Sequence, residues 1–285
     1  MTSTRALVVG GTAGIGYAIA IRLAAESASS RIIVSGRNKP KDIPHTNIEF
    51  SALDASSMRS IKKYTDSFKS TQPQSLDLLI LSQGIGTLAG RTETAEGIDV
   101  KMALHFYGRQ LLIRELLPIL KQDARVVIVL DGKTGSAPSQ LDWTDLDLKK
   151  NYGIANAAKY CVTMTDAMVQ AFAAQQAAEG SSSRHFIHAY PGIVNTSISA
   201  KMPWIVRPIV KGLLSVFGVQ PDVCAEHMLT GTRTVTIEGE KGGRFWSCLD
   251  DRGRLVSDKP DWSADQIKGI ENHTWTIIEE ALKKP

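Results

Sequence analysis

A glycine-rich segment near the N-terminus is the part of the sequence with the clearest chemical capacity, because it can hold a phosphate group. The segment Gly10-Gly-Thr-Ala-Gly-Ile-Gly16 follows a short apolar run and precedes a stretch with helical apolar periodicity. Its glycines allow a tight turn and a close approach of the backbone to a pyrophosphate. The helix expected next adds free N–H groups and the positive end of its dipole. The sequence therefore predicts a dinucleotide site here, formed by Gly10, Thr12, Gly14, Ile15 and Gly16.

The elements that would position this site follow an alternating pattern of short apolar runs and helical segments. Strands are expected at residues 6–10, 31–35, 48–53, 76–81, 125–130 and 185–189, with a last one near 243–247. Helices are expected at residues 15–25, 100–120 and 157–178. Near-continuous apolar strands joined by helices predict a parallel sheet that is covered on both faces. Because such connections are right-handed, we expect a Rossmann-type, doubly wound α/β fold with three layers, α/β/α.

Length and composition predict one domain. The chain has 285 residues, 43% of them hydrophobic, so we expect a single domain over residues 1–285. Its formal charge of +4 comes from interspersed acidic and basic residues, which argues against a nucleic-acid surface. The cysteines Cys161, Cys224 and Cys248 are far apart and lack a Cys-x-x-Cys pair. They are expected to be buried thiols of a reducing compartment, and no metal site is expected.

Two segments bear on the question of membranes. The chain runs from Met1 directly into an apolar strand, without the basic segment, apolar stretch and cleavage site typical of a signal peptide. Residues 202–219 are apolar but are interrupted by Arg207, Lys211 and two prolines, so they are too broken to span a bilayer. The expectation is a cytoplasmic protein without a membrane span.

The spacing Gly-x-x-x-Gly-x-Gly at residues 10–16 resembles the fingerprint of the short-chain dehydrogenase/reductase family. The resemblance covers most of residues 5–200 and includes markers after three further strands, namely Asp54, Ala55, Gly84, Pro191, Gly192 and Thr196. It implies that Asp54 contacts the adenine amino group of a nicotinamide dinucleotide. It also implies that the markers after the sixth strand enclose the nicotinamide. The family's Asn-Asn-Ala-Gly motif, however, is replaced here by Leu81-Ser-Gln-Gly84.

The end of the second strand bears on which nucleotide is bound. Members of the family that bind NAD(H) usually carry an acidic residue there, which holds the ribose 2′-hydroxyl. This chain instead reads Ser35-Gly-Arg-Asn38, without a carboxylate to repel a 2′-phosphate. Arg37 can pair with that phosphate through charge-assisted hydrogen bonds, with Asn38 beside it. The sequence therefore favours NADP(H); if Arg37 is only a surface residue, the preference is weak rather than reversed.

The family's catalytic residues are largely replaced. The resemblance implies a Tyr with a Lys four residues later, a Ser after the fifth strand and an Asn in a long helix. The matching positions hold Tyr152, Asn156, Asp131 and His105. Without the Lys, a neutral Tyr152 can still donate a proton but would be a poor base. We hypothesise that Asp131 and Tyr152 carry the proton transfer, with His105, which titrates in the useful range, as partner of Asp131.

Each of these three residues also has a simpler interpretation. Tyr152 is then an aromatic residue at the start of a helix. Asp131 caps a turn with Gly132, and His105 is a half-buried histidine whose hydrogen bonds are satisfied.

The segment after the nicotinamide markers is expected to contact the substrate. Residues 193–225 are bulky and apolar and are predicted to form a substrate lid, and residues 226–285 a C-terminal elaboration. A lid of this kind favours a hydrophobic substrate. The alternative is a helix that covers the core or packs in a dimer, and a homo-oligomer is expected. The segment Leu141–Leu148 loosely resembles a loop of retinol-dehydrogenase-like members.

Three functions remain open at this point. The first is NADPH-dependent reduction of a carbonyl on a hydrophobic small molecule, in secondary (specialised) metabolism. The second is a cyclase, isomerase or dehydratase without net redox change that uses Asp131, His105 and Tyr152. The third is a catalytically inactive nucleotide-binding or scaffold protein. Product analysis separates the first two, since only reduction adds two hydrogens to the substrate.

Overall fold

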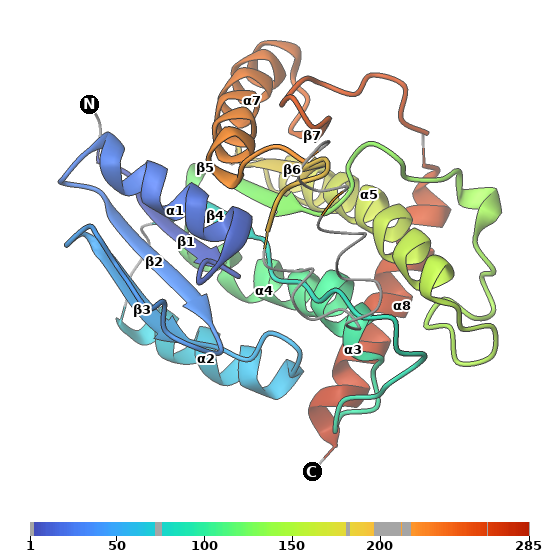
Figure 1. Ribbon diagram of the computed structural model, residues 1–285. Helices are drawn as coiled ribbons and strands as arrows, with labels where there is room; N and C mark the ends of the chain where they lie inside the picture. Colours follow the sequence, from blue (N-terminus) through green and yellow to red (C-terminus); the bar gives the residue numbers. More distant parts are fainter. Residues whose placement is uncertain are drawn as a thin grey trace.

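The computed structural model describes residues 3–71, 76–180, 183–196, 212, 218–260 and 262–284. One seven-stranded sheet runs through the molecule, and all of its neighbouring strands pair in parallel (Figure 1). The strands are β1 (Arg5–Val9), β2 (Arg31–Gly36), β3 (Ile48–Ala52), β4 (Leu76–Leu81), β5 (Leu120–Val129), β6 (His185–Ala189) and β7 (Trp246–Leu249). Their order across the sheet is β3-β2-β1-β4-β5-β6-β7. This is the order of a doubly wound Rossmann sheet, as predicted.

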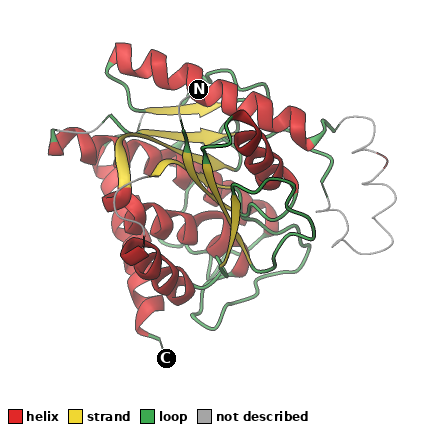
Figure 2. Ribbon diagram, turned by 90° about the vertical axis from the view of Figure 1, so that its left-hand side faces the viewer, coloured by secondary structure: helices red, strands yellow, loops and turns green. Residues whose placement is uncertain are grey.

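Helices cover both faces of the sheet and complete three layers (Figures 1 and 2). The longer helices are α1 (Gly14–Glu26), α2 (Met58–Thr71), α4 (Gly108–Leu116), α5 (Ile154–Glu179), α7 (Pro221–Gly242) and α8 (Ala264–Lys283). The short ones are α3 (Val100–Met102), a π-helical turn (Ala103–Tyr107) and the 3-10 turns Leu117–Ile119 and Pro138–Gln140. Helices α1 and α7 pack together on one face, whereas α2, α4, α5 and α8 contribute to the core of the other.

The apolar strands supply both cores at once because successive side chains of a strand point to opposite faces. In β1, Leu7 and Val9 pack into the core under α2, α4, α5 and α8. Ala6 and Val8 pack into the core under α1 and α7. This explains why the strands read as continuous apolar runs rather than as an alternation. The three cysteines are buried and unpaired in the same interior, as expected.

Several boundaries differ from the prediction. The expected helix at 100–120 is divided into α3, the π-helical turn and α4, and the chain is already in β5 at Leu120. The fifth strand therefore begins five residues earlier than the predicted 125–130, since Leu120 pairs with Leu76 of β4. The last strand, Trp246–Leu249, begins three residues later than the predicted 243–247.

Most of the predicted lid, residues 193–225, lies outside the described residues. Of its described part, Val194 and Val219 form an isolated parallel bridge, and Pro221 begins α7. The predicted C-terminal elaboration, residues 226–285, supplies most of α7, the edge strand β7 and α8. Within the described residues, no helix combines the length and apolar character needed to cross a bilayer.

Candidate functional site

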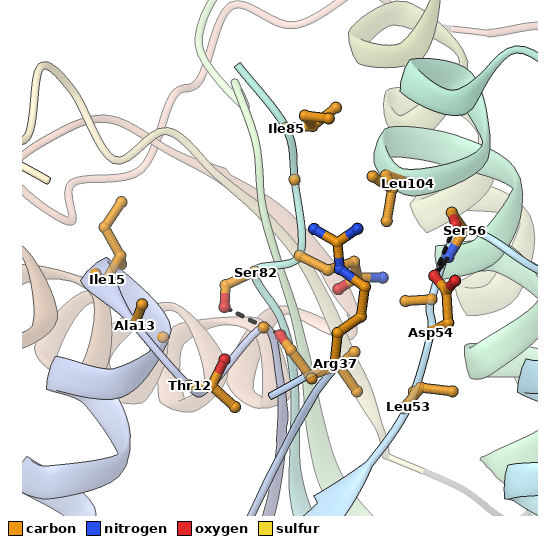
Figure 3. A pocket seen from close by; sticks show the side chains of 18 of the residues that line it. Thr12, Ala13, Ile15, Arg37, Leu53, Asp54, Ser56, Ser82, Ile85 and Leu104 are labelled. Carbon is orange, nitrogen blue, oxygen red and sulfur yellow. Dashed lines mark hydrogen bonds between the residues drawn. The ribbon is translucent and has the colours of Figure 1, made fainter. Parts of the chain in front are cut away.

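A cavity of about 290 Å³ opens at the carboxyl ends of β1 to β4 (Figure 3). The strand order places it at the switch point between β1 and β4, where ligands bind in open parallel sheets. Ten residues predicted from the sequence to bind the nucleotide line it together: Gly10, Thr12, Gly14, Ile15, Gly16, Arg37, Asp54, Ala55, Gly84 and Thr196. The other three, Asn38, Pro191 and Gly192, are not among its lining residues.

The glycine turn packs directly against the end of β4. Gly10 has φ +80°, and a Cβ added there would lie 2.5 Å from the backbone nitrogen of Gln83. A Cβ on Gly16 would collide with the Ser82 hydroxyl and would lie 2.6 Å from the carbonyl oxygen of Gly10. Only glycine fits at either position. Helix α1 then begins without a side-chain cap and without an acidic residue in its first turn, so its N-terminal amides remain available to an anion.

Two charged side chains, Arg37 after β2 and Asp54 after β3, line the cavity. Figure 3 shows the Arg37 side chain extending from the end of β2 over the cavity, and its side chain is exposed. Asp54 is held by the backbone N–H and the hydroxyl of Ser56, which donate to Oδ1 at 3.0 and 2.6 Å. The end of β2 thus offers a cation and no carboxylate to a bound nucleotide.

His105 is hydrogen-bonded to Ile85, one of the residues that line the cavity. Its Nε2 accepts a hydrogen bond from the backbone N–H of Ile85 at 3.1 Å, so the ring proton is on Nδ1. Burial, and to a lesser extent the positive charges of Arg109 and Lys101, lower the pKa of His105 from 6.5 to about 3. A pKa this low predicts that His105 does not exchange protons in the neutral range, and the bond from Ile85 agrees with the interpretation of a half-buried, hydrogen-bonded histidine.

This pKa predicts that His105 makes the fold sensitive to acid. Between about pH 3 and 6.5 the unfolded chain binds a proton that the folded chain does not, so the free energy of unfolding falls as the pH is lowered. His105→Gln keeps an acceptor for Ile85 but cannot titrate. In urea unfolding below about pH 6, we expect the variant to lose about 1.4 kcal/mol less per pH unit than the wild type. Equal slopes for the two proteins would contradict a depressed pKa.

Asp131 caps a turn. Its Oδ1 accepts the backbone N–H groups of Lys133 and Thr134 at 3.2 and 3.0 Å, and its Oδ2 accepts the Thr134 hydroxyl at 2.5 Å. These are the bonds expected if Asp131 caps the turn. Among the described residues no contact joins Asp131 with His105, so the expected partnership is not formed. The backbone N–H of Asp131 points instead to His188 Nε2, at 3.3 Å.

His188 belongs to a buried network that the sequence did not reveal. Its Nδ1 lies 2.7 Å from Asp166 Oδ1, and Lys259 Nζ lies 2.6 Å from Asp166 Oδ2. Because Nε2 accepts the Asp131 N–H, Nδ1 carries the proton and donates it to Asp166. Cys248 Sγ lies 3.5 Å from Asp166 Oδ1, the oxygen that His188 also contacts. Asp166, His188 and Cys248 are metal-ligand types, but the proton on Nδ1 and the Lys259 charge leave no fit for a cation.

Arg109 is a fully buried cation, and two of the residues that it contacts, Leu104 and Gln83, line the cavity. Its guanidinium donates to the carbonyl oxygens of Leu104 at 3.1 Å, Val129 at 2.9 Å and Gln83 at 2.5 Å. Burial lowers its pKa from 12.5 to about 9, so it remains charged at neutral pH. One side chain thus joins the π-helical turn, the end of β5 and the segment after β4.

Comparison with known proteins shows which family this chain belongs to. The chain matches the family described as short chain dehydrogenase over residues 4–141. Oxidoreductase AN1596 of Emericella nidulans is 34% identical over 205 residues, which cover 68% of this chain and 59% of that relative. This chain belongs to the short-chain dehydrogenase family. Human polyprenol dehydrogenase is 29% identical over 255 residues, covering 83% of this chain and 74% of that protein.

A solved structure shares this fold. The crystal structure of an NADPH-bound carbonyl reductase from chicken fatty liver superposes with a TM-score of 0.61 and 17% identity. The superposition covers 90% of this chain and 99% of the reductase. The two proteins therefore share one fold, and the match of this chain to the Emericella nidulans relative spans less than two thirds of that protein.

In this chain, a lysine from another element lies beside Tyr152. The Tyr152 hydroxyl donates to Asp99 Oδ1 at 3.4 Å, a long hydrogen bond. Lys101 Nζ lies 5.4 Å from the centre of the Tyr152 ring and 3.7 Å from Asp99 Oδ2, and its side chain is 7% exposed. The four-residue spacing missing from the sequence therefore does not mean that Tyr152 lacks a neighbouring cation. Spacing along one helix could not reveal Lys101, because it lies at the start of α3.

Proposed function

We propose that this protein binds NADP(H) and uses NADPH to reduce a carbonyl group on a hydrophobic small molecule. The observation that carries the proposal is the end of β2, where Arg37 faces the cavity and no carboxylate stands. A guanidinium pairs with a 2′-phosphate through charge-assisted hydrogen bonds, whereas a carboxylate would repel it. The fold neighbour described as an NADPH-bound carbonyl reductase supports the same cofactor and reaction class.

Calorimetric titration of the purified protein with NADPH and with NADH tests this proposal. We expect micromolar binding of NADPH and much weaker binding of NADH, because only NADPH carries the 2′-phosphate. Equal affinities would overturn the cofactor assignment. Failure to bind either nucleotide would mean that the glycine turn does not hold a dinucleotide, and the proposed reaction would fall with it.

The proposal of a hydrophobic substrate rests on the side chains where the chain leaves β6. Ile193 and Val219 are 54% and 37% exposed, and the backbone N–H of Val219 donates to the Ile193 carbonyl at 2.9 Å. Val223, on the first turn of α7, is 39% exposed. Thr196, three residues after Ile193, lines the cavity. An apolar rim at this end suits a lipophilic carbonyl compound. The relative named for its action on polyprenol supports this substrate class.

Bound NADPH would supply a hydride, so the chain must supply a proton to the carbonyl oxygen. We propose Tyr152 and Asp131 for this step. Tyr152 is the residue left from the family's catalytic set, and Lys101 lies beside its ring. Asp131 follows β5, and its backbone N–H donates to His188 Nε2, which helps to hold the turn in place.

A double variant, Asp131→Asn with Tyr152→Phe, tests this assignment. We expect turnover of a lipophilic carbonyl substrate to fall by about 100-fold or more, which is the ordinary contribution of a general acid. NADPH affinity is the control and should change little, since neither residue lines the cavity. A double variant with full activity would exclude both residues from the proton transfer.

A further inference from the structure

Gln83 lines the nucleotide cavity and carries a buried amide without a partner. The residue is 6% exposed, and in the described part of the chain neither its Oε1 nor its Nε2 has a hydrogen-bond partner. A buried polar group left unpaired costs about 1–3 kcal/mol, and such groups are rare in folded proteins. A cost of this size at the wall of a cavity indicates a partner that enters the cavity from outside the chain.

The main chain of Gln83 is held firmly, so its side chain leaves from a fixed point. Arg109 donates to the Gln83 carbonyl, and the Gly10 backbone packs against the Gln83 nitrogen. The residue therefore sits beside the glycine turn, on the same cavity wall as Ser82 and Gly84. The terminal torsion of a glutamine is broad, so the amide can turn toward a ligand without moving the backbone.

The chemistry of the amide selects its partner. An amide offers two N–H donors and one carbonyl acceptor, and it is uncharged. A phosphate would use the donors but would leave Oε1 facing a negative charge. A hydroxyl group both donates and accepts, and it matches the amide on both sides. In a nicotinamide dinucleotide, the hydroxyl groups belong to the two riboses.

We propose that Gln83 binds a ribose hydroxyl of the dinucleotide, an inference that rests on the proposed function. The motif of the family that Leu81-Ser-Gln-Gly84 replaces has alanine at this position, so the contact is a property of this chain. The unpaired Gln83 amide then lowers the stability of the empty protein, and its hydrogen bond to the ribose hydroxyl strengthens binding of the dinucleotide.

The test is Gln83→Met, which keeps the length of the side chain and removes the amide. We expect NADPH affinity to fall about three- to tenfold, as for one lost hydrogen bond. The empty protein, in contrast, should unfold at the same or a higher temperature, because an unpaired buried amide has been replaced by an apolar group. A glutamine with a purely structural role would not give opposite signs in the two measurements.

Gln110→Met is the matched control. Gln110 is fully buried in α4, both of its amide atoms lack a partner among the described residues, and it does not line the cavity. Its replacement should leave NADPH affinity unchanged. An equal loss of affinity in both variants, an unchanged affinity in Gln83→Met, or a lower unfolding temperature of the empty Gln83→Met protein would overturn the proposal.

Titration with 2′,5′-ADP identifies the ribose. If Gln83→Met weakens 2′,5′-ADP as much as NADPH, the contact is to the adenosine ribose. If it weakens NADPH alone, the contact is to the nicotinamide ribose; both results support the proposal. A wild type that binds neither NADPH nor NADH would overturn the proposed function and this contact together. If the wild type binds NADPH, the proposed cofactor stands, and the two methionine variants test the Gln83 contact by itself.

Discussion

Replacement of Arg109 by methionine is expected to lower the free energy of unfolding by about 3 kcal/mol or more. Three carbonyl oxygens, of Leu104, Val129 and Gln83, would lose the buried guanidinium that donates to them. Each buried acceptor left unpaired costs about 1–3 kcal/mol. Urea unfolding at neutral pH measures the change, and a tryptophan fluorescence signal follows the transition.

Arg114→Met, on the same helix, is the control for this variant. The Arg114 guanidinium lies 4.2 Å from the centre of the Trp275 ring and 3.8 Å from Glu279, and its side chain is 32% exposed. Contacts of this exposed kind contribute about 1 kcal/mol or less. A loss in Arg109→Met no larger than that in Arg114→Met would show that the three carbonyls find other partners.

The fold could be predicted where the signal is local. Residues 76–81 and 185–189 are expected as strands and observed as β4 and β6, because each is a short apolar run between polar segments. The break in the predicted helix 100–120 carries no such signal. The π-helical turn has the same apolar periodicity as its flanks, and it is held by contacts of His105 with Ile85 and of Arg109 with Leu104. Those contacts depend on tertiary packing, which periodicity does not report.

The candidate site likewise has a part that the sequence predicts and parts that it does not. The glycine turn is a local motif whose chemistry can be derived from its spacing, and the structure places its residues around one cavity. The Asp166, His188 and Lys259 network comes from α5, β6 and the segment after β7, which only the folded sheet brings together. Lys101 beside Tyr152 is a second case. In both, side chains that are far apart in the sequence meet only in the folded chain.

The second large effect is expected from Arg37→Asp, which should weaken NADPH about 100-fold. The variant removes a cation that can form charge-assisted hydrogen bonds and puts a negative charge where the 2′-phosphate would lie. A loss of about 2.7 kcal/mol corresponds to this factor. NADH affinity should hold or rise, since a carboxylate at the end of β2 can accept a hydrogen bond from the free 2′-hydroxyl. Calorimetric titrations with both nucleotides give the preference directly.

Lys39→Asp separates this local contact from a general loss of positive charge. Lys39 is exposed, lies two residues beyond Arg37 and does not line the cavity, and its replacement makes the same change in net charge. At an ionic strength of about 0.15 M, charges more than about 8 Å from the phosphate are largely screened, so Lys39→Asp should leave both affinities nearly unchanged. If Arg37→Asp instead weakens NADPH and NADH by the same factor, then Arg37 acts on a part that both nucleotides share. The preference for NADP(H) would then have to come from a residue other than Arg37.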